Sequence, residues 1–154
     1  MLNSDYREML QCLSGENVSF LLIGAYAVAA YGFPRATKDI DILVGPSPDN
    51  ASSVMKALAR FGAPLDGVSA EDFSTEGIVF QIGNSPRRID ILTRISGVEF
   101  QQAYERRQVV ELEGIQVPVI SLEDLIANKR ATGRMQDLAD VERLESVRLG
   151  EPRK

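Results

Sequence analysis

The chain has 154 residues, a formal net charge of −5, no histidine and one cysteine. Histidine general-base catalysis, cysteine–histidine zinc sites and a disulfide framework within one chain are therefore excluded. The negative charge argues against a broad surface that coats nucleic acid. The length and the 44% of apolar residues favour one domain over residues 1–150, followed by a frayed tail over 151–154.

The N-terminal region carries neither a signal-peptide pattern nor an apolar stretch long enough to cross a bilayer. A cytoplasmic protein with no membrane partner is therefore predicted. Cys12 stands beside Leu13 in a predicted helix, and we interpret it as a packing residue rather than a nucleophile.

Hydrophobic periodicity predicts the elements of the first half of the chain. They are a helix over 4–14, a strand over 18–23, an alanine-rich helix over 26–31, a strand over 39–44 and a helix over 48–61. A loop with Pro34 separates the second helix from the second strand, because proline bars continuation of the helix. Helices and strands thus alternate in this half.

The second half of the chain is predicted to begin with a loop over 63–76. Strands over 78–82 and 88–93, a helix over 98–106, a hairpin over 109–117, and helices over 125–129 and 136–147 follow. This order favours an α/β (α+β) domain in which two layers, a mixed sheet and its flanking helices, pack together.

Three aspartates in predicted strands form the most informative pattern. Asp39 and Asp41 alternate with apolar residues, so both side chains leave one face of a strand, and Asp90 opposes Ile89 and Ile91 in the same way on a later strand. If the two strands are neighbours, the carboxylates meet, and their repulsion favours a divalent cation between them. The alternative is structural, with Asp39 at a strand end and Asp41 paired to a nearby basic side chain.

Gly24-Ala25 lies where an apolar strand turns into a helix. A helix N-terminus presents free N–H groups, and glycine lets a phosphate approach them. Taken alone, such a glycine is more often a turn residue. The spacing from this junction to the aspartate pair makes the combined pattern stronger than either part.

The stretch from Leu22 to Val44 carries both features and resembles the DNA polymerase β-like nucleotidyltransferase superfamily. It is closest to the minimal-nucleotidyltransferase branch and the abortive-infection-type nucleotidyltransferase toxins. The stretch from Leu125 to Asp140 resembles the C-terminal helices of these small proteins. Ala25 departs from the family pattern, which has glycine or serine there; the backbone N–H remains, but a hydroxyl is lost.

This resemblance implies a nucleotidyltransferase fold and a set of site residues. Asp39, Asp41 and Asp90 would bind catalytic Mg²⁺ or Mn²⁺, with Asp90 also helping to activate the acceptor hydroxyl. Gly24 and the amide of Ala25 would hold the outer phosphates of a nucleoside triphosphate. The acceptor would attack the α-phosphate and pyrophosphate would leave.

Several basic residues are candidates for contacts in this site. Arg35 and Lys38, in the loop before the aspartate strand, would clamp phosphates or else lie solvated. Lys129 is a candidate through the resemblance. Arg87 and Arg88 are treated as ion-pair candidates only, and Arg88 is expected on the Asp90 side only if the strand is bulged. Arg134 and Asp137 are spaced to pair across one helix turn.

The sequence thus predicts a metal-dependent nucleotidyltransferase that uses a nucleoside triphosphate and an unidentified acceptor, either protein, RNA or a small hydroxylated molecule. A homodimer or a partner chain would supply the acceptor site. The alternative is a catalytically weak nucleotide-binding regulator or toxin–antitoxin component that acts through protein contacts. A hydrolase of phosphate esters with the same metals is a third possibility, which release of phosphate rather than pyrophosphate would identify.

Overall fold

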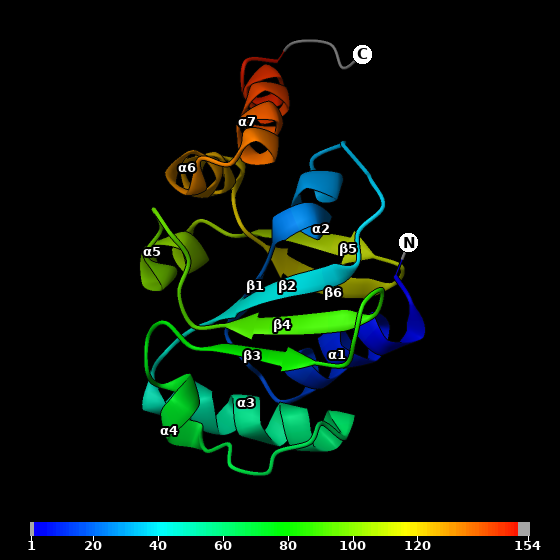
Figure 1. Ribbon diagram of the computed structural model, residues 1–154, viewed down its shortest axis with the longest axis vertical. Helices are drawn as coiled ribbons and strands as arrows, with labels where there is room; N and C mark the ends of the chain where they lie inside the picture. Colours follow the sequence, from blue (N-terminus) through cyan, green and yellow to red (C-terminus); the bar gives the residue numbers. More distant parts are fainter. Residues whose placement is uncertain (1, 151–154) are drawn as a thin grey trace.

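The structure, a computed structural model, describes residues 2–150, so the predicted tail over 151–154 lies outside the described residues. A six-stranded sheet runs through the centre in the order β3-β4-β2-β1-β6-β5 (Figure 1). The strands are β1 (Phe20–Ile23), β2 (Asp39–Val44), β3 (Val79–Ile82), β4 (Arg88–Leu92), β5 (Gln108–Leu112) and β6 (Ile115–Val119). The predicted strands are all present, with ends that move by one or two residues.

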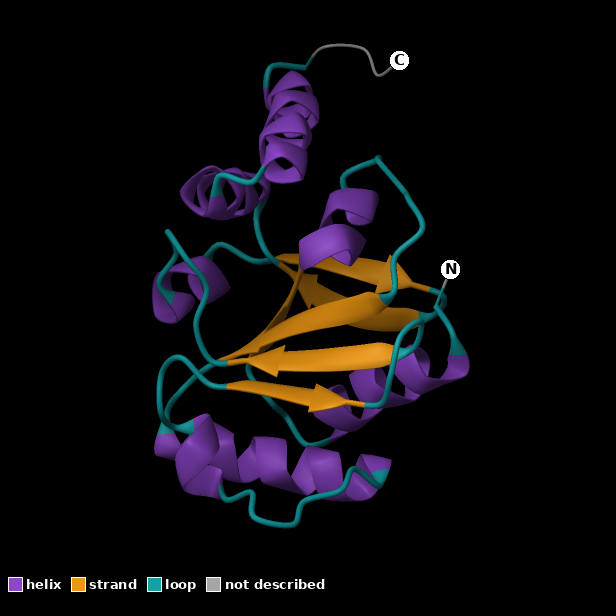
Figure 2. Ribbon diagram, viewed as in Figure 1, coloured by secondary structure: helices purple, strands orange, loops and turns teal. Residues whose placement is uncertain are grey.

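The sheet is mixed. β2 pairs in parallel with β4 and β1 with β6, whereas the β1–β2, β3–β4 and β5–β6 pairs are antiparallel. The central strand β1 is a continuous buried apolar run, whereas its neighbour β2 begins with aspartates that alternate with buried isoleucines. Helices lie on both faces of the sheet (Figure 2). This confirms the predicted α/β (α+β) architecture of a mixed sheet flanked by helices.

Seven helices are present among the described residues, and side chains cap the starts of several of them. Their bounds are α1 (Ser4–Gly15), α2 (Gly24–Ala30), α3 (Pro48–Phe61), α4 (Ala70–Phe73), α5 (Phe100–Glu105), α6 (Leu122–Thr132) and α7 (Met135–Arg148). Ser47 accepts a hydrogen bond from the Asn50 amide at the start of α3, and Gly62 ends that helix in a left-handed conformation. Ser121 likewise accepts from the Asp124 amide at the start of α6.

One element is not predicted from the sequence. The segment expected to be a loop over 63–76 contains the short helix α4, which a capping box between Ser69 and Asp72 begins. Phe73 of this helix is buried and meets Phe80 of β3 edge to face. One turn is too short to show a helical period in sequence, so periodicity had nothing to detect.

The core lies between the sheet and the helices α1 and α3 on one face, and under α2 on the other (Figure 1). Cys12 is buried in this core, as predicted for a packing residue. Within residues 2–150, every helix is too short or too polar to span a bilayer.

Candidate active site

The parallel pairing of β2 with β4 brings the three aspartates together. Asp41 lies directly opposite Asp90 in the register of the two strands. One carboxylate oxygen from each of Asp39, Asp41 and Asp90 lies within 4.8 Å of the other two. The predicted juxtaposition of these side chains on one sheet face is therefore present in the structure.

The carboxylates of this acidic triad repel one another. Burial, together with the negative charges of Asp39 and Asp90, raises the pKa of Asp41 from its usual value to about 7. No cationic side chain pairs with Asp41 among the described residues. Carboxylate oxygens are the ligands that Mg²⁺ and Mn²⁺ prefer, and a divalent ion would remove the repulsion, so the donor set fits such a metal.

Arg88 joins two members of the acidic triad. Its Nε donates to Asp90 Oδ1 at 2.9 Å, and its Nη2 donates to Asp90 Oδ2 at 3.1 Å and to Asp39 Oδ2 at 2.8 Å. The expectation that Arg88 needs a bulge to reach Asp90 was wrong, because residues two apart on a regular strand share a face. Arg87 points elsewhere and pairs with Asp5 at 3.5 Å.

Gly24 packs directly against this triad. Its φ of +66° is left-handed, and a Cβ placed on it would lie 2.5 Å from Asp41 Oδ2. Any side chain at this position would therefore collide with the carboxylate as well as strain the backbone. The glycine at the β1–α2 junction thus has a reason to be there besides the phosphate role that the resemblance implies.

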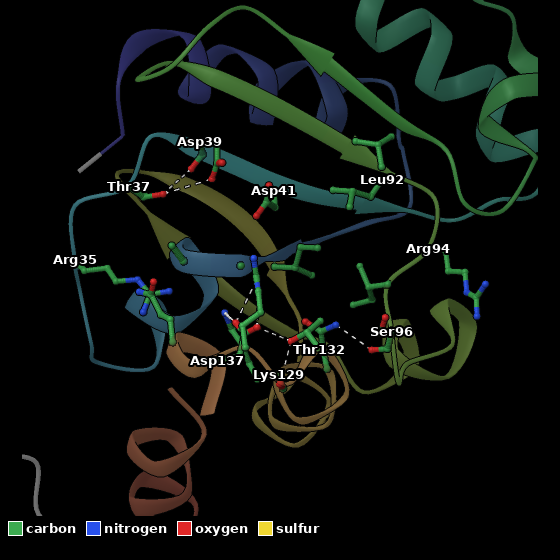
Figure 3. Close-up of a pocket in the computed structure, with 18 of the residues that line it drawn as sticks. Arg35, Thr37, Asp39, Asp41, Leu92, Arg94, Ser96, Lys129, Thr132 and Asp137 are labelled. Carbon is green, nitrogen blue, oxygen red and sulfur yellow. Dashed lines mark hydrogen bonds and ion pairs between the residues drawn. The ribbon is translucent and has the colours of Figure 1, made fainter. Parts of the chain in front are cut away.

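A cavity of about 690 Å³ opens beside the triad (Figure 3). Asp39 and Asp41 line it from the sheet, and Gly24 and Ala25 line it from the start of α2. Lys129 and Asp137 lie across the cavity from these aspartates (Figure 3), and Arg35, Arg94 and Arg134 also line it. The cavity therefore has one acidic wall and a second, predominantly basic wall, called the basic wall below.

Lys129, on the basic wall, is buried and belongs to an ionic network between α6 and α7. Its Nζ lies 3.3 Å from Asp137 Oδ1 and 3.2 Å from Asp140 Oδ2. The second contact is an ion pair without hydrogen-bond geometry, since Asp140 Oδ2 has no hydrogen-bond partner although it is buried. Lys129 was a site candidate from sequence, whereas Asp137 was expected only as an ion-pair partner of Arg134 and Asp140 was not a candidate.

Three arginines complete this network, one of which is Arg143, with its Nη1 3.8 Å from Asp140 Oδ1. Arg35 Nη1 lies 2.6 Å from Asp140 Oδ1, and Arg134 Nε lies 2.7 Å from Asp137 Oδ2. Burial raises the pKa of Asp137, but hydrogen bonds from Arg134, Thr132 and Lys129 outweigh it and hold the pKa well below its usual range. The pair of Arg134 with Asp137 agrees with the spacing in sequence.

The loop before β2 contributes some of its residues to the cavity and leaves others exposed to solvent. Arg35 reaches the cavity but pairs with Asp140, not with Asp41 as the structural alternative required. Lys38 is exposed and is absent from the described residues that line the cavity. Thr37, which was not a candidate, donates to the Asp39 backbone carbonyl at 3.1 Å and lines the cavity.

Solved structures of nucleotidyltransferases share this fold. LnuA, a lincosamide antibiotic adenylyltransferase, matches with a TM-score of 0.62 and 14% identity over 96% of this chain and 98% of its own. The antibiotic-resistance factor ANT(2'')-Ia matches with a TM-score of 0.64 and 14% identity, over 96% of this chain and 83% of its own. TM1012 from Thermotoga maritima, named as a nucleotidyltransferase, matches with a TM-score of 0.55 and 21% identity over 97% and 94%.

A search of curated protein sequences found no match. A family model does match, over residues 2–151, and its description is nucleotidyl transferase of unknown function. This range includes the acidic triad, the Gly24 junction and both helices of the ionic network. The predicted relationship to nucleotidyltransferases is confirmed, and the chain belongs to the nucleotidyl transferase family DUF2204.

Proposed function

We propose that the protein transfers a nucleoside monophosphate from a nucleoside triphosphate to a hydroxyl acceptor, with Mg²⁺ or Mn²⁺ as cofactor and pyrophosphate as the leaving group. The observation that carries this proposal is that one cavity is lined by the carboxylates of Asp39 and Asp41 and by the cations of Arg35, Lys129 and Arg134. A metal–triphosphate complex has the complementary distribution of charge, with a cation at one end and phosphate oxygens along its length.

In this proposal the acidic triad holds the metal. Asp39 and Asp41 supply ligand oxygens, and Asp90 completes the set. The metal, when bound, neutralises charge on the transferring phosphoryl group and the leaving oxygen. Asp90 accepts the proton of the acceptor hydroxyl. The hydroxyl oxygen of the acceptor then bonds to the α-phosphorus, while the bond from that phosphorus to the oxygen that bridges the α- and β-phosphates breaks and pyrophosphate leaves.

The start of α2, next to the triad, and the basic wall together hold the phosphates in this proposal. Gly24 and Ala25 offer backbone N–H groups, the role that the family resemblance assigns to them. Arg35 and Lys129 provide positive charge from the basic wall. Lys38, exposed beside the cavity, has the weakest claim to a phosphate contact and would reach a bound nucleotide only from the rim.

Ala25 supports a second candidate, a nucleotide-binding regulator or toxin–antitoxin component that binds but does not turn over. Loss of one hydroxyl hydrogen bond to a charged phosphate costs roughly 1.5–3 kcal/mol. We favour the enzyme because three carboxylates converge within 4.8 Å, which a protein that only binds nucleotide does not require.

We propose a small hydroxylated molecule as the acceptor. Among the fold relatives, LnuA is described as lincomycin-bound, and ANT(2'')-Ia as a complex with adenylyl-2''-tobramycin. A second hollow of about 440 Å³ shares Ala25 and residues 35–37 with the main cavity, which leaves room for such a molecule. Protein and RNA remain rival acceptors, and a homodimer or partner chain would then complete the acceptor site.

The test is an assay of pyrophosphate release. Wild type and Asp41→Asn are incubated with each nucleoside triphosphate, Mg²⁺ or Mn²⁺, and a small-molecule, protein or RNA fraction as acceptor. The proposal expects the wild type, but not Asp41→Asn, to release pyrophosphate and to produce an acceptor that carries the nucleoside monophosphate. Nucleotide binding without pyrophosphate in every fraction would favour the regulator, and release of inorganic phosphate would favour a hydrolase.

A further inference from the structure

One guanidinium group serves two of the three carboxylates in the acidic triad. Both oxygens of Asp90 and one oxygen of Asp39 accept hydrogen bonds from Arg88, all within 3.1 Å. Asp41 receives none of these bonds, although it lies opposite Asp90. Arg88 therefore partly neutralises Asp39 and Asp90 as a metal ion would, and leaves Asp41 without a hydrogen bond from a cation.

A divalent metal ion and the Arg88 guanidinium cannot both bind the oxygens of Asp39 and Asp90 without a cost in free energy. A divalent ion and a guanidinium bound to the same carboxylate repel each other at short range, and in a half-buried site this repulsion is weakly screened. Asp90 is the member most affected, since it is 6% exposed and both of its oxygens face Arg88. The side chain of Arg88 itself is 31% exposed, so solvent is available to it if it leaves.

We propose that Arg88 is a built-in counter-ion that competes with divalent metal for Asp39 and Asp90. This inference rests on the proposed function. In the metal-free protein, Arg88 holds the carboxylates of β2 and β4 together. The first divalent ion binds on the Asp41 side, and full engagement of Asp90 requires Arg88 to give up its hydrogen bonds. Arg88 is thus a positioning residue that sets the affinity and order of metal binding.

The rival interpretation is that Arg88 is a cross-strand ion pair that only stabilises the sheet. The two interpretations predict opposite changes in metal affinity. If Arg88 competes, its removal exposes more negative charge to the ion and tightens binding. If it only holds the strands in register, its removal lets the carboxylates separate and weakens binding.

The experiment titrates Mn²⁺ into the full chain without nucleotide and counts free Mn²⁺ by electron paramagnetic resonance. The proteins are wild type, Arg88→Met, Arg88→Lys and the control Arg87→Met. Arg87 precedes Arg88 but pairs with Asp5, so its variant changes the same net charge away from the triad. A pH of about 8 keeps proton competition for Asp41 small, since its pKa is about 7. Thermal unfolding checks that each variant is folded.

We expect Arg88→Met to bind Mn²⁺ roughly tenfold or more tightly than wild type, as removal of a unit charge a few ångströms away would do. Arg88→Lys, which keeps the charge, should lie near wild type, and Arg87→Met should equal it. Weaker or unchanged binding in Arg88→Met would overturn the competition while leaving the proposed function standing. No Mn²⁺ bound by wild type or by Arg88→Met would overturn the metal site and this inference together.

Discussion

The cavity has two walls built on aspartates, half-buried or buried in the acidic triad and fully buried in the network between α6 and α7, and their charges are balanced in opposite ways. In the acidic triad, the single guanidinium of Arg88 pairs with Asp39 and Asp90, and Asp41 has no paired cation among the described residues. In the network between α6 and α7, Asp137 and Asp140 are paired with four cations, from Arg35, Lys129, Arg134 and Arg143. The acidic triad thus has fewer cations than carboxylates, whereas the network between α6 and α7 has more cations than carboxylates.

The comparison shows that the surroundings, and not the residue type, decide what a buried aspartate does. The pKa of Asp41 is raised to about 7, whereas that of Asp137 is held below its usual range. A wall that lacks cations attracts a metal, and a wall with surplus cations attracts an anion. Variants that alter one wall at a time should therefore have separable effects.

The largest loss of stability is expected from Lys129→Met. The ammonium is buried between Asp137 and Asp140, so its removal leaves two buried carboxylates short of a partner. Breaking a buried ion pair in this way costs roughly 3–5 kcal/mol. Urea denaturation of the metal-free protein measures this loss, and a change below about 1 kcal/mol would mean that the network is not integral to the fold.

Asp41→Asn is expected to act in the opposite direction. Because the pKa of Asp41 is raised to about 7 in the folded protein, the folded state holds a proton that the unfolded chain releases near pH 4. The free energy of unfolding of metal-free wild type should therefore fall, relative to Asp41→Asn, as the pH rises from about 4 to about 7. The difference between the two proteins should reach roughly 2–4 kcal/mol.

Denaturation curves of both proteins at several pH values test this expectation. The variant serves as the control for all other titrating groups, so only the difference between the curves counts. A difference that stays constant with pH would show that Asp41 ionises normally and that repulsion within the triad is negligible.

Gly24→Ala tests the contact between the β1–α2 junction and the triad. A left-handed backbone costs a non-glycine residue about 1–2 kcal/mol, and the new Cβ would also press on Asp41 Oδ2. Gly67→Ala is the matched control, because Gly67 has a φ of +75° and a Cβ added there would meet nothing within 4 Å. We expect similar backbone strain in both variants, but weaker Mn²⁺ binding in Gly24→Ala only.

Calorimetric Mn²⁺ titration of the two glycine variants separates the effects. If both bind Mn²⁺ like wild type, the Gly24 contact does not hold Asp41 in place.

Arg134→Gln should have the smallest effect on stability. Its side chain is 77% exposed although it pairs with Asp137 at 2.7 Å, and exposed pairs contribute roughly 0–1 kcal/mol. Thermal unfolding at low and at high salt measures this contribution. A loss as large as that of Lys129→Met would remove the distinction between the buried and exposed cations of the network.

The acidic wall could be predicted well from sequence because its signals are local. Alternation over β2 and β4 places Asp39, Asp41 and Asp90 on faces without knowledge of the rest of the chain. Only the pairing of the two strands had to be assumed. The same alternation places Arg88 on the same face as Asp90. The expectation that a bulge would be needed was wrong because it treated residues two apart on a strand as if they lay on opposite faces.

The basic wall was harder to predict from sequence because several of its contacts join residues far apart in the chain. Arg35 and Asp140 are 105 residues apart and meet only once α7 has packed over the loop before β2. Asp137 and Asp140 stand at helical spacing from Val141 and Leu144, the buried apolar residues of α7, so the period indicates that they face inward. It could not show which cations they meet. The short helix α4 escaped prediction for a different reason, since a single turn has no period.

The central claim, that the acidic wall holds a metal–nucleotide complex, is tested most directly by calorimetry. A non-hydrolysable nucleoside triphosphate with Mg²⁺ is titrated into wild type and Asp41→Asn. We predict binding in the wild type and a loss in the variant beyond the roughly 10–100-fold typical of outer-shell changes at metal sites. Equal binding in both folded proteins, or binding in neither, would contradict the claim, because the acidic wall would then play no part in holding the nucleotide.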